Sequence, residues 1–239
     1  MNLVRALVAL FTLTVTLHAN LLWAQTYECR QITSPVVVDG SLDDPGWQTA
    51  NWVSLRKNET GETPNSQGKF SILWDSRNLY LAFDFVDQNI LTTIDTRDAR
   101  LWIQDVAEIF IDPLQSEKVY YEFQFNAREN WRDVVVIHRG VDHQINPLAE
   151  WNSTTLLGAV VRGTLENNQD QDQGWTLEVA IPFKDLWLAP NIPPKPGDQW
   201  RVNIFRIDYG LERTELSAWN PTNGPSFHIP TKFGTLIFR

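Results

Sequence analysis

The residues most suited to chemistry are clustered at 101–113, LWIQDVAEIFIDP, which combines Trp102 with the carboxylates Asp105, Glu108 and Asp112. Two carboxylates can supply the acid and base of a glycoside hydrolase, here Glu108 with Asp105 or Asp112. Glycosidase carboxylates flank the sugar from two sides, whereas these are close together in sequence. A carboxylate near a Trp ring can also bind a polar ligand by hydrogen bonding and ring stacking. The segment therefore favours binding over catalysis.

A second set of polar residues is placed by strand periodicity. Glu108 lies in an alternating run that predicts a β-strand with the carboxylate on its polar face. Residues 120–126 alternate in the same way, with Gln124 and Asn126 on the polar side, and Arg128 shares their parity if the strand continues. If the two strands are neighbours, these four side chains share one face. A carboxylate, amides and a guanidinium hydrogen-bond sugar hydroxyls well, although the same pattern would also fit a solvated sheet face.

Other chemistries find little support in the sequence. There is no G-x-S-x-G or H-E-x-x-H motif, and Cys29, the single cysteine, cannot form a disulfide within the chain. The only methionine is Met1, which argues against a Met/His haem ligand pair in a processed chain. The formal net charge of −9 argues against nucleic acid or an anionic membrane surface as a partner, and it fits a neutral or cationic ligand.

The N-terminus resembles a secretory leader. Arg5 is followed by an apolar run that is too short to span a bilayer, and Ala19 or Ala24 can precede a cleavage site. We therefore expect a signal peptide over residues 1–24 and a secreted or periplasmic mature chain of residues 25–239. We also expect that chain to be a single domain, monomeric, and without a membrane segment.

Many short strands position these residues. Strands are predicted at 32–39, 70–74, 79–86, 106–112, 120–126, 134–138, 156–162, 175–181, 200–209 and 235–238, and short helical turns at 42–50 and 183–188. The connections are rich in Pro, Gly and Asn, and no internal repeat is visible. The pattern predicts an all-β fold, an antiparallel β-sandwich with one or two short helices.

Several segments together resemble carbohydrate-binding module family 9. They are VDGSLDDPGWQTA, LWIQDVAEIFIDP, YYEFQFNARENWRD, WTLEVAIPFKDL and SAWNPT followed by FHIPTKFGTLIF, and they cover nearly the whole mature chain. The resemblance implies a DOMON-like, jelly-roll-like β-sandwich that binds sugars, in the best-known members at reducing ends, and has no catalytic activity of its own. An alternative on the same fold is an accessory domain that binds an envelope component or another protein.

The resemblance also implies roles for particular residues. Trp102 would be the first of two Trp rings that hold the sugar, Trp219 the second ring, Glu108 the acid and Arg128 the guanidinium. Arg132 and Arg97 are alternatives for the guanidinium.

The resemblance further implies structural calcium. The candidate ligands are Asp39, Asp43, Asp44 and Asp75, none of which has a diagnostic spacing.

Overall fold

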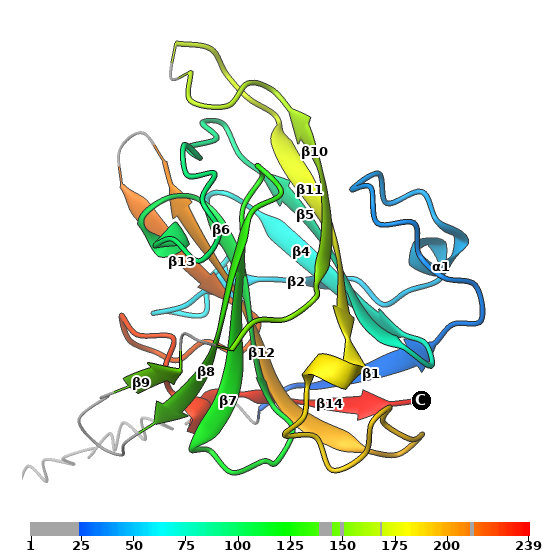
Figure 1. Ribbon diagram of the computed structural model, residues 1–239. Helices are drawn as coiled ribbons and strands as arrows, with labels where there is room; N and C mark the ends of the chain where they lie inside the picture. The colour runs from blue at the N-terminus through cyan, green and yellow to red at the C-terminus, as the bar shows by residue number, and fades with distance from the viewer. Residues whose placement is uncertain (1–23, 139–144, 149–150, 168, 211–212) are drawn as a thin grey trace, which may run out of the picture.

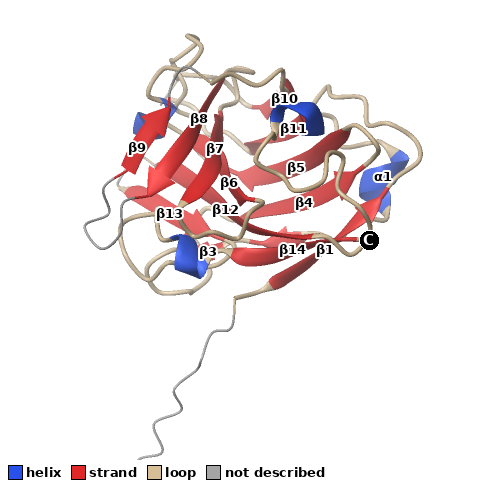
Figure 2. Cartoon of the chain, turned by 60° about the horizontal axis from the view of Figure 1, so that its bottom comes forward, coloured by secondary structure: helices blue, strands red, loops and turns tan. Residues whose placement is uncertain are grey.

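The computed structural model describes residues 24–239 except 139–144, 149–150, 168 and 211–212. The predicted leader therefore lies outside the described residues, apart from Ala24. Figures 1 and 2 show a chain built almost wholly of strands that curl into two facing layers. The predicted all-β sandwich is confirmed. None of the helices in the described part of the chain is long and apolar enough to cross a membrane.

The strands are short and follow one another closely along the chain. They are β1 (Thr26–Gln31), β2 (Val53–Ser54), β3 (Arg56–Lys57), β4 (Gly68–Trp74), β5 (Asn78–Val86), β6 (Val106–Asp112), β7 (Val119–Phe125), β8 (Trp131–His138), β9 (Ile145–Leu148), β10 (Leu156–Arg162), β11 (Gly174–Pro182), β12 (Gln199–Tyr209), β13 (Thr214–Ala218) and β14 (Gly234–Phe238). The helical segments are α1 (Pro45–Gln48) and the 3-10 turns η1 (Leu101–Ile103), η2 (Phe183–Asp185) and η3 (Pro230–Lys232).

The strands are hydrogen-bonded in the order β10-β11-β5-β4-β1-β14-β12-β6-β7-β8-β9. Strand β13 pairs with β12 and β3, and β2 pairs with β4. Nearly all of these pairs are antiparallel, but β1 runs parallel to both β14 and β4 and so joins the two layers. Residues 32–39, predicted as a strand, form none; the strand lies earlier, at β1, and Pro35 lacks the N–H that a paired position needs.

The main core lies between the layers. Phe83 and Trp175 from one layer pack in the same apolar cluster as Ile109, Phe123 and Ile204 from the other. Ile109 and Phe123 occupy odd-numbered positions of β6 and β7, as the alternation predicts. The even-numbered positions, including Glu108, therefore point to the other face of their sheet.

That other face is not simply solvated. A second apolar cluster covers it, in which Leu101, Phe227 and Phe233 from connecting segments pack near Phe110 and Phe205 of the sheet. Both faces of β6 are consequently buried along its length. The polar residues that alternation places here lie at the bottom of a covered pocket, which sequence periodicity alone could not indicate.

Candidate functional site

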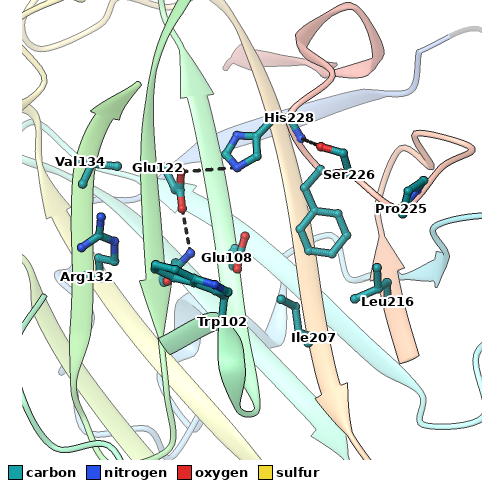
Figure 3. A pocket seen from close by; sticks show the side chains of 12 residues that line it. Trp102, Glu108, Glu122, Arg132, Val134, Ile207, Leu216, Pro225, Ser226 and His228 are labelled. Carbon is teal, nitrogen blue, oxygen red and sulfur yellow. Dashed lines mark hydrogen bonds and ion pairs between the residues drawn. The ribbon is translucent and has the colours of Figure 1, made fainter. Parts of the chain in front are cut away.

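A pocket of about 460 Å³ opens on the outer face of β6, β7 and β8 (Figure 3). Its polar lining residues are Glu108, Glu122, Gln124, Arg132, Ser226 and His228. Its apolar lining residues are Trp102, Val134, Ile207, Leu216, Pro225 and Phe227. The volume lies in the range typical of small-molecule sites, roughly 300–1,000 Å³. Apolar walls around a few convergent polar groups are also typical of such sites.

The polar floor is a row of side chains across three neighbouring strands. Glu108 of β6 lies opposite Gln124 of β7, which lies opposite Arg132 of β8. Glu122 is two residues from Gln124 on the same strand and so shares its face. The antiparallel register therefore brings two carboxylates, an amide and a guanidinium onto one surface.

Two acceptor groups on this floor lack hydrogen-bond partners among the described residues. The buried Oε1 of Gln124 accepts no hydrogen bond from them. Its Nε2 donates to Glu122 Oε1 at 2.7 Å. The carboxylate of Glu108, a residue only 2% exposed, makes neither a hydrogen bond nor an ion pair with another described residue. Because unpaired buried acceptors are costly, they indicate a place for donor groups of a ligand.

The two glutamates on the floor influence each other. Burial raises the pKa of Glu122 to about 7, while the Arg132 charge and the Gln124 hydrogen bond act in the opposite direction. Burial raises the pKa of Glu108 well above its usual range, and repulsion by Glu122 raises it further. Near neutral pH this carboxylate pair therefore holds on to protons that exposed glutamates would release.

The rim of the pocket carries an exposed aromatic ring. Trp102 lies in η1 and is 36% exposed, and the Arg132 guanidinium lies 5.4 Å from its ring centroid. Phe227 contributes to the apolar wall and stacks on Phe205 with the ring centroids 4.2 Å apart. An exposed indole beside polar acceptors can stack on the C–H face of a sugar ring.

His228 is held from several sides. Its ring stacks on Phe110 with centroids 5.0 Å apart, and its Nδ1 is 2.7 Å from the hydroxyl of Tyr120. Its Nε2 lies 4.0 Å from Glu122 Oε2, as the dashed line in Figure 3 marks. The imidazole is therefore a fixed polar group at the edge of the glutamate pair.

Three of the predicted ligand-binding residues come together in this pocket, namely Trp102, Glu108 and Gln124. The predicted adjacency of the two strands is also correct, since β6 and β7 pair directly.

The prediction that Trp219 forms the second ring of a two-Trp sugar site is wrong. Trp219 is 1% exposed and belongs to the main core, where its ring packs edge-on against Tyr27 and Phe70 at centroid distances of 6.3 and 5.8 Å. The AWNPT segment looks like a surface turn in sequence. Ala218 ends β13, however, and the Trp219 N–H donates to the carbonyl of Ile204, which places the indole in the core.

Arg128 and Asn126 are also not among the residues that line the pocket. Arg128 donates from Nε to the Thr92 carbonyl at 2.6 Å and forms an ion pair with Glu166. Asn126 accepts hydrogen bonds from the N–H groups of Arg128 and Asn130, both at 3.1 Å, and thereby shapes the turn after β7. Both residues support the loops beside the pocket rather than its floor.

The guanidinium in the pocket is that of Arg132, one of the two alternatives from sequence. The other, Arg97, pairs with Asp133 and Asp98. The sequence reasoning overlooked Glu122, although it shares the parity of Gln124, and it overlooked the segment 225–228. Only tertiary structure brings that segment to the pocket, so no local signal pointed to it.

The carboxylates proposed as catalytic partners of Glu108 lie elsewhere. Asp105 accepts hydrogen bonds from the N–H groups of Leu91 and Tyr209 at 2.5 and 2.6 Å. Asp112 accepts one from the Glu117 N–H at 2.7 Å. Neither lines the pocket, so the Glu108–Asp105 and Glu108–Asp112 pairs do not form a shared site.

Three of the four calcium candidates have local roles. Asp39, Asp44 and Asp75 accept hydrogen bonds from nearby N–H groups of Ser41, Val37 and Arg77, which close short turns. Calcium binding at these residues stays a prediction.

A separate cluster of three carboxylates has oxygens close enough together to hold a cation. Oxygens of Asp87, Asp105 and Asp208 lie within 4.8 Å of one another, and all three residues are buried. The Arg206 guanidinium is 2.9 Å from Asp87 and 3.7 Å from Asp208. Since that guanidinium already supplies a positive charge, the cluster is explained as a buried ion-pair network.

The fold is a β-sandwich with a concave pocket on one sheet face. A family model described as "Carbohydrate family 9 binding domain-like" matches residues 38–239, and the chain belongs to this family. The resemblance seen in the sequence is thus confirmed.

Solved structures share the fold. A putative carbohydrate-binding protein from Bacteroides uniformis has a TM-score of 0.69 at 15% identity, with 91% of this chain and 100% of that chain covered. A carbohydrate binding module family 9 from Caldicellulosiruptor kristjanssonii, in complex with cellotriose, has a TM-score of 0.60 at 16% identity, covering 90% and 94%. The same module has also been solved with glucose.

Two relatives are similar in sequence. An "Extracellular protein" of Arthroderma benhamiae is 26% identical over 230 residues, which are 93% of this chain and 99% of the relative. Endo-1,4-beta-xylanase A of Thermotoga neapolitana is 24% identical over 201 residues, or 84% of this chain. The chain spans only 17% of the length of that xylanase.

Proposed function

We propose that the pocket binds a carbohydrate and carries out no reaction on it. The observation that carries the proposal is the Gln124 Oε1, a buried oxygen without a partner among the described residues, beside the Glu108 carboxyl on a floor bordered by the exposed ring of Trp102. Family membership supports it, as do the structural neighbours that were solved with cellotriose and glucose.

The sugar would bind by two kinds of contact. One C–H face of a pyranose would stack on Trp102, and its hydroxyls would donate to Glu108 and Gln124. Arg132 and His228 offer donor groups at the edge of the same floor. Because Trp219 is in the core, the sugar would stack on one indole ring, that of Trp102, and not between two. A pocket of about 460 Å³ suits one sugar unit or the end of a short glycan.

The arrangement of carboxylates favours binding over hydrolysis. Glu108 and Glu122 line the pocket from adjacent strands of one sheet and therefore approach a ligand from the same side. Glycosidases need their two carboxyl groups on both sides of the scissile bond. We expect no release of reducing sugar from common plant and microbial glycans. Product release that disappears in Glu108→Gln would contradict this.

Isothermal titration calorimetry with glucose, cellotriose and a glycan panel tests the proposal. Binding that is saturable and is weakened by Trp102→Ala supports it. The absence of binding to every sugar, in protein shown to be folded, would contradict it and would favour the accessory-domain alternative.

We also propose that the protein is exported. The leader-like sequence of residues 1–24 motivates this, and the Arthroderma relative named "Extracellular protein" supports it. N-terminal sequencing of protein from the extracytoplasmic fraction should find a start near residue 25. An intact Met1 in that fraction would count against a cleaved leader.

A further inference from the structure

The two buried glutamates of the pocket differ in their hydrogen-bond and ion-pair partners. Glu122 accepts a hydrogen bond from Gln124 at 2.7 Å and has the His228 Nε2 at 4.0 Å. Glu108 has no hydrogen-bond or ion-pair partner among the described residues, although it is equally deep in the pocket. A buried carboxylate without a partner is unfavourable, so Glu108 is the group whose environment a ligand can most improve.

The guanidinium of Arg132 does not act as the cationic partner of Glu108. Glu108 lies on β6 and Arg132 on β8, with β7 between them, which corresponds to roughly 9–10 Å between strand axes. Arg132 also has contacts of its own, because NH1 donates to the Asp98 carbonyl at 2.8 Å and the guanidinium lies over the Trp102 ring. The positive charge is thus held at the rim and does not compensate the Glu108 carboxyl.

The two groups on the floor that have no partner among the described residues both offer acceptor oxygens. The Glu108 carboxylate and the Gln124 Oε1 come from directly opposed residues, whose Cβ atoms are typically about 4.5–5.5 Å apart. One small group with several donors can therefore reach both. An ammonium group offers several N–H donors and no acceptor, whereas a hydroxyl offers a single donor.

We propose that the pocket prefers a sugar bearing a protonated amino group, such as a 2-amino-2-deoxyhexose unit, over a neutral sugar of the same size. This inference rests on the proposed sugar-binding function and narrows its ligand class. Glu108 releases its proton to solvent and pairs as a carboxylate with the ammonium, which also donates to Gln124 Oε1, while the sugar ring stacks on Trp102.

Two further features favour a cationic ligand. Burial and the neighbouring Glu122 raise the pKa of Glu108, so its ionised form lacks the stabilisation that a cationic ligand would supply. The formal net charge of the chain is −9, which attracts cations toward the surface in general. The second effect does not depend on Glu108, so the experiment must separate the two.

Calorimetry with glucose, glucosamine and N-acetylglucosamine tests the inference at about pH 6, where an aliphatic amine is protonated. N-acetylglucosamine carries nitrogen at the same position but has no charge. We expect glucosamine to bind at least about tenfold more tightly than either neutral sugar, as a charge-assisted hydrogen bond would provide.

Two variants test whether the preference for glucosamine comes from Glu108 or from the net charge of the chain. Glu108→Gln should abolish the preference for glucosamine while still allowing glucose to bind. Glu28→Gln removes one charge from an exposed side chain of β1, whose partner is Arg239, and should leave the preference unchanged. Loss of the preference in Glu28→Gln, or its survival in Glu108→Gln, would overturn the role of Glu108.

The wild-type comparison is decisive even if a variant folds poorly. If glucose binds as tightly as glucosamine, the inference fails and the proposed function stands. If none of the three sugars nor any glycan of the panel binds, the proposed function fails as well.

Discussion

The guanidinium of Arg132 lies 5.4 Å from the centroid of the Trp102 ring, and NH1 of the same residue is anchored to the Asp98 carbonyl at 2.8 Å. A residue of β8 thus supports a ring that belongs to the connection before β6. This contact supports the exposed indole at the rim of the pocket, and we expect it to restrict the ring before a ligand binds. Such preorganisation lowers the entropic cost of binding.

Trp102→Ala should weaken sugar binding by about 1–2 kcal/mol, close to tenfold, because the stacking surface is lost. The melting temperature should change little, since the ring is partly exposed. Trp187→Ala is a matched control: Trp187 is 55% exposed and does not line the pocket. Calorimetry should show normal affinity for that control, and unchanged affinity in Trp102→Ala would contradict the stacking role.

Glu108→Ala should weaken the binding of a neutral sugar by roughly 0.5–1.5 kcal/mol, the net value of a hydrogen bond to a carboxyl group that is protonated near neutral pH. The fold should remain intact, because the carboxylate makes no hydrogen bond or ion pair to the described part of the protein. Calorimetry and thermal unfolding measured together check this. A collapse of the melting temperature would show that Glu108 has a structural role.

The sequence correctly predicted two residues of the pocket floor, on β6 and β7, but did not single out the one beyond the turn between β7 and β8. Alternation placed Glu108 and Gln124 on one face, and the direct pairing of β6 with β7 put them opposite each other. Arg128 does not line the pocket, because β7 ends at Phe125 and Glu129 adopts a positive φ of 57°, which reverses the chain. The turn sets the hairpin register, and that register returns Arg132 to the position opposite Gln124.

The rest of the site depends on contacts between distant parts of the sequence. Phe227 and His228 reach the pocket because their segment covers the outer face of the sheet, where Phe227 stacks on Phe205 and His228 on Phe110. Neither residue stands in a pattern that predicts such a contact. The exposure of a Trp is equally a tertiary property, which is why Trp102 and Trp219 looked alike in sequence.

Protonation of Glu122 should make stability depend on pH. Its pKa in the folded protein is about 7, above the usual 4.5, so the folded state binds more protons than the unfolded state between these values. The resulting stability is fully present below pH 4.5 and is lost as pH rises through about 7, by roughly 1–3 kcal/mol.

Chemical denaturation of wild type and Glu122→Gln across that pH range measures this contribution. The free energy of unfolding of wild type should fall more steeply with pH than that of the variant. Buried acids that do not interact with Glu122 contribute to both proteins and cancel in the comparison, whereas the change in Glu108, whose pKa Glu122 raises, is part of the measured difference. Parallel pH profiles would mean that Glu122 titrates alike in the folded and unfolded states.

Trp219→Ala should destabilise the protein by about 3–5 kcal/mol, because it empties a fully buried indole site beside Tyr27 and Phe70. Trp219→Phe should cost less, since part of the volume is retained. In Trp219→Phe, sugar affinity should be unchanged at a temperature where the variant is folded. A large loss of affinity without loss of stability would restore Trp219 as a ligand contact.

Arg206→Met should strongly destabilise the protein. Arg206 is fully buried, bonds Asp87 at 2.9 Å and donates to the Val86 carbonyl at 2.9 Å. Its removal leaves the cluster of Asp87, Asp105 and Asp208 without a described cation, which we expect to cost about 3–5 kcal/mol. The pKa of Asp105 is already raised to about 8 by burial and by Asp87, so further proton uptake should accompany the loss.

Arg239→Met is the matched control for Arg206→Met. Arg239 pairs with Glu28 at 2.9 Å, but both side chains are more than half exposed, so the change should cost less than about 1 kcal/mol. Chemical denaturation near neutral pH compares the two variants, and a return to about pH 5 should recover part of the stability of Arg206→Met as the acids take up protons. Equal, small losses in both variants would mean that the buried guanidinium does not balance the carboxylate cluster.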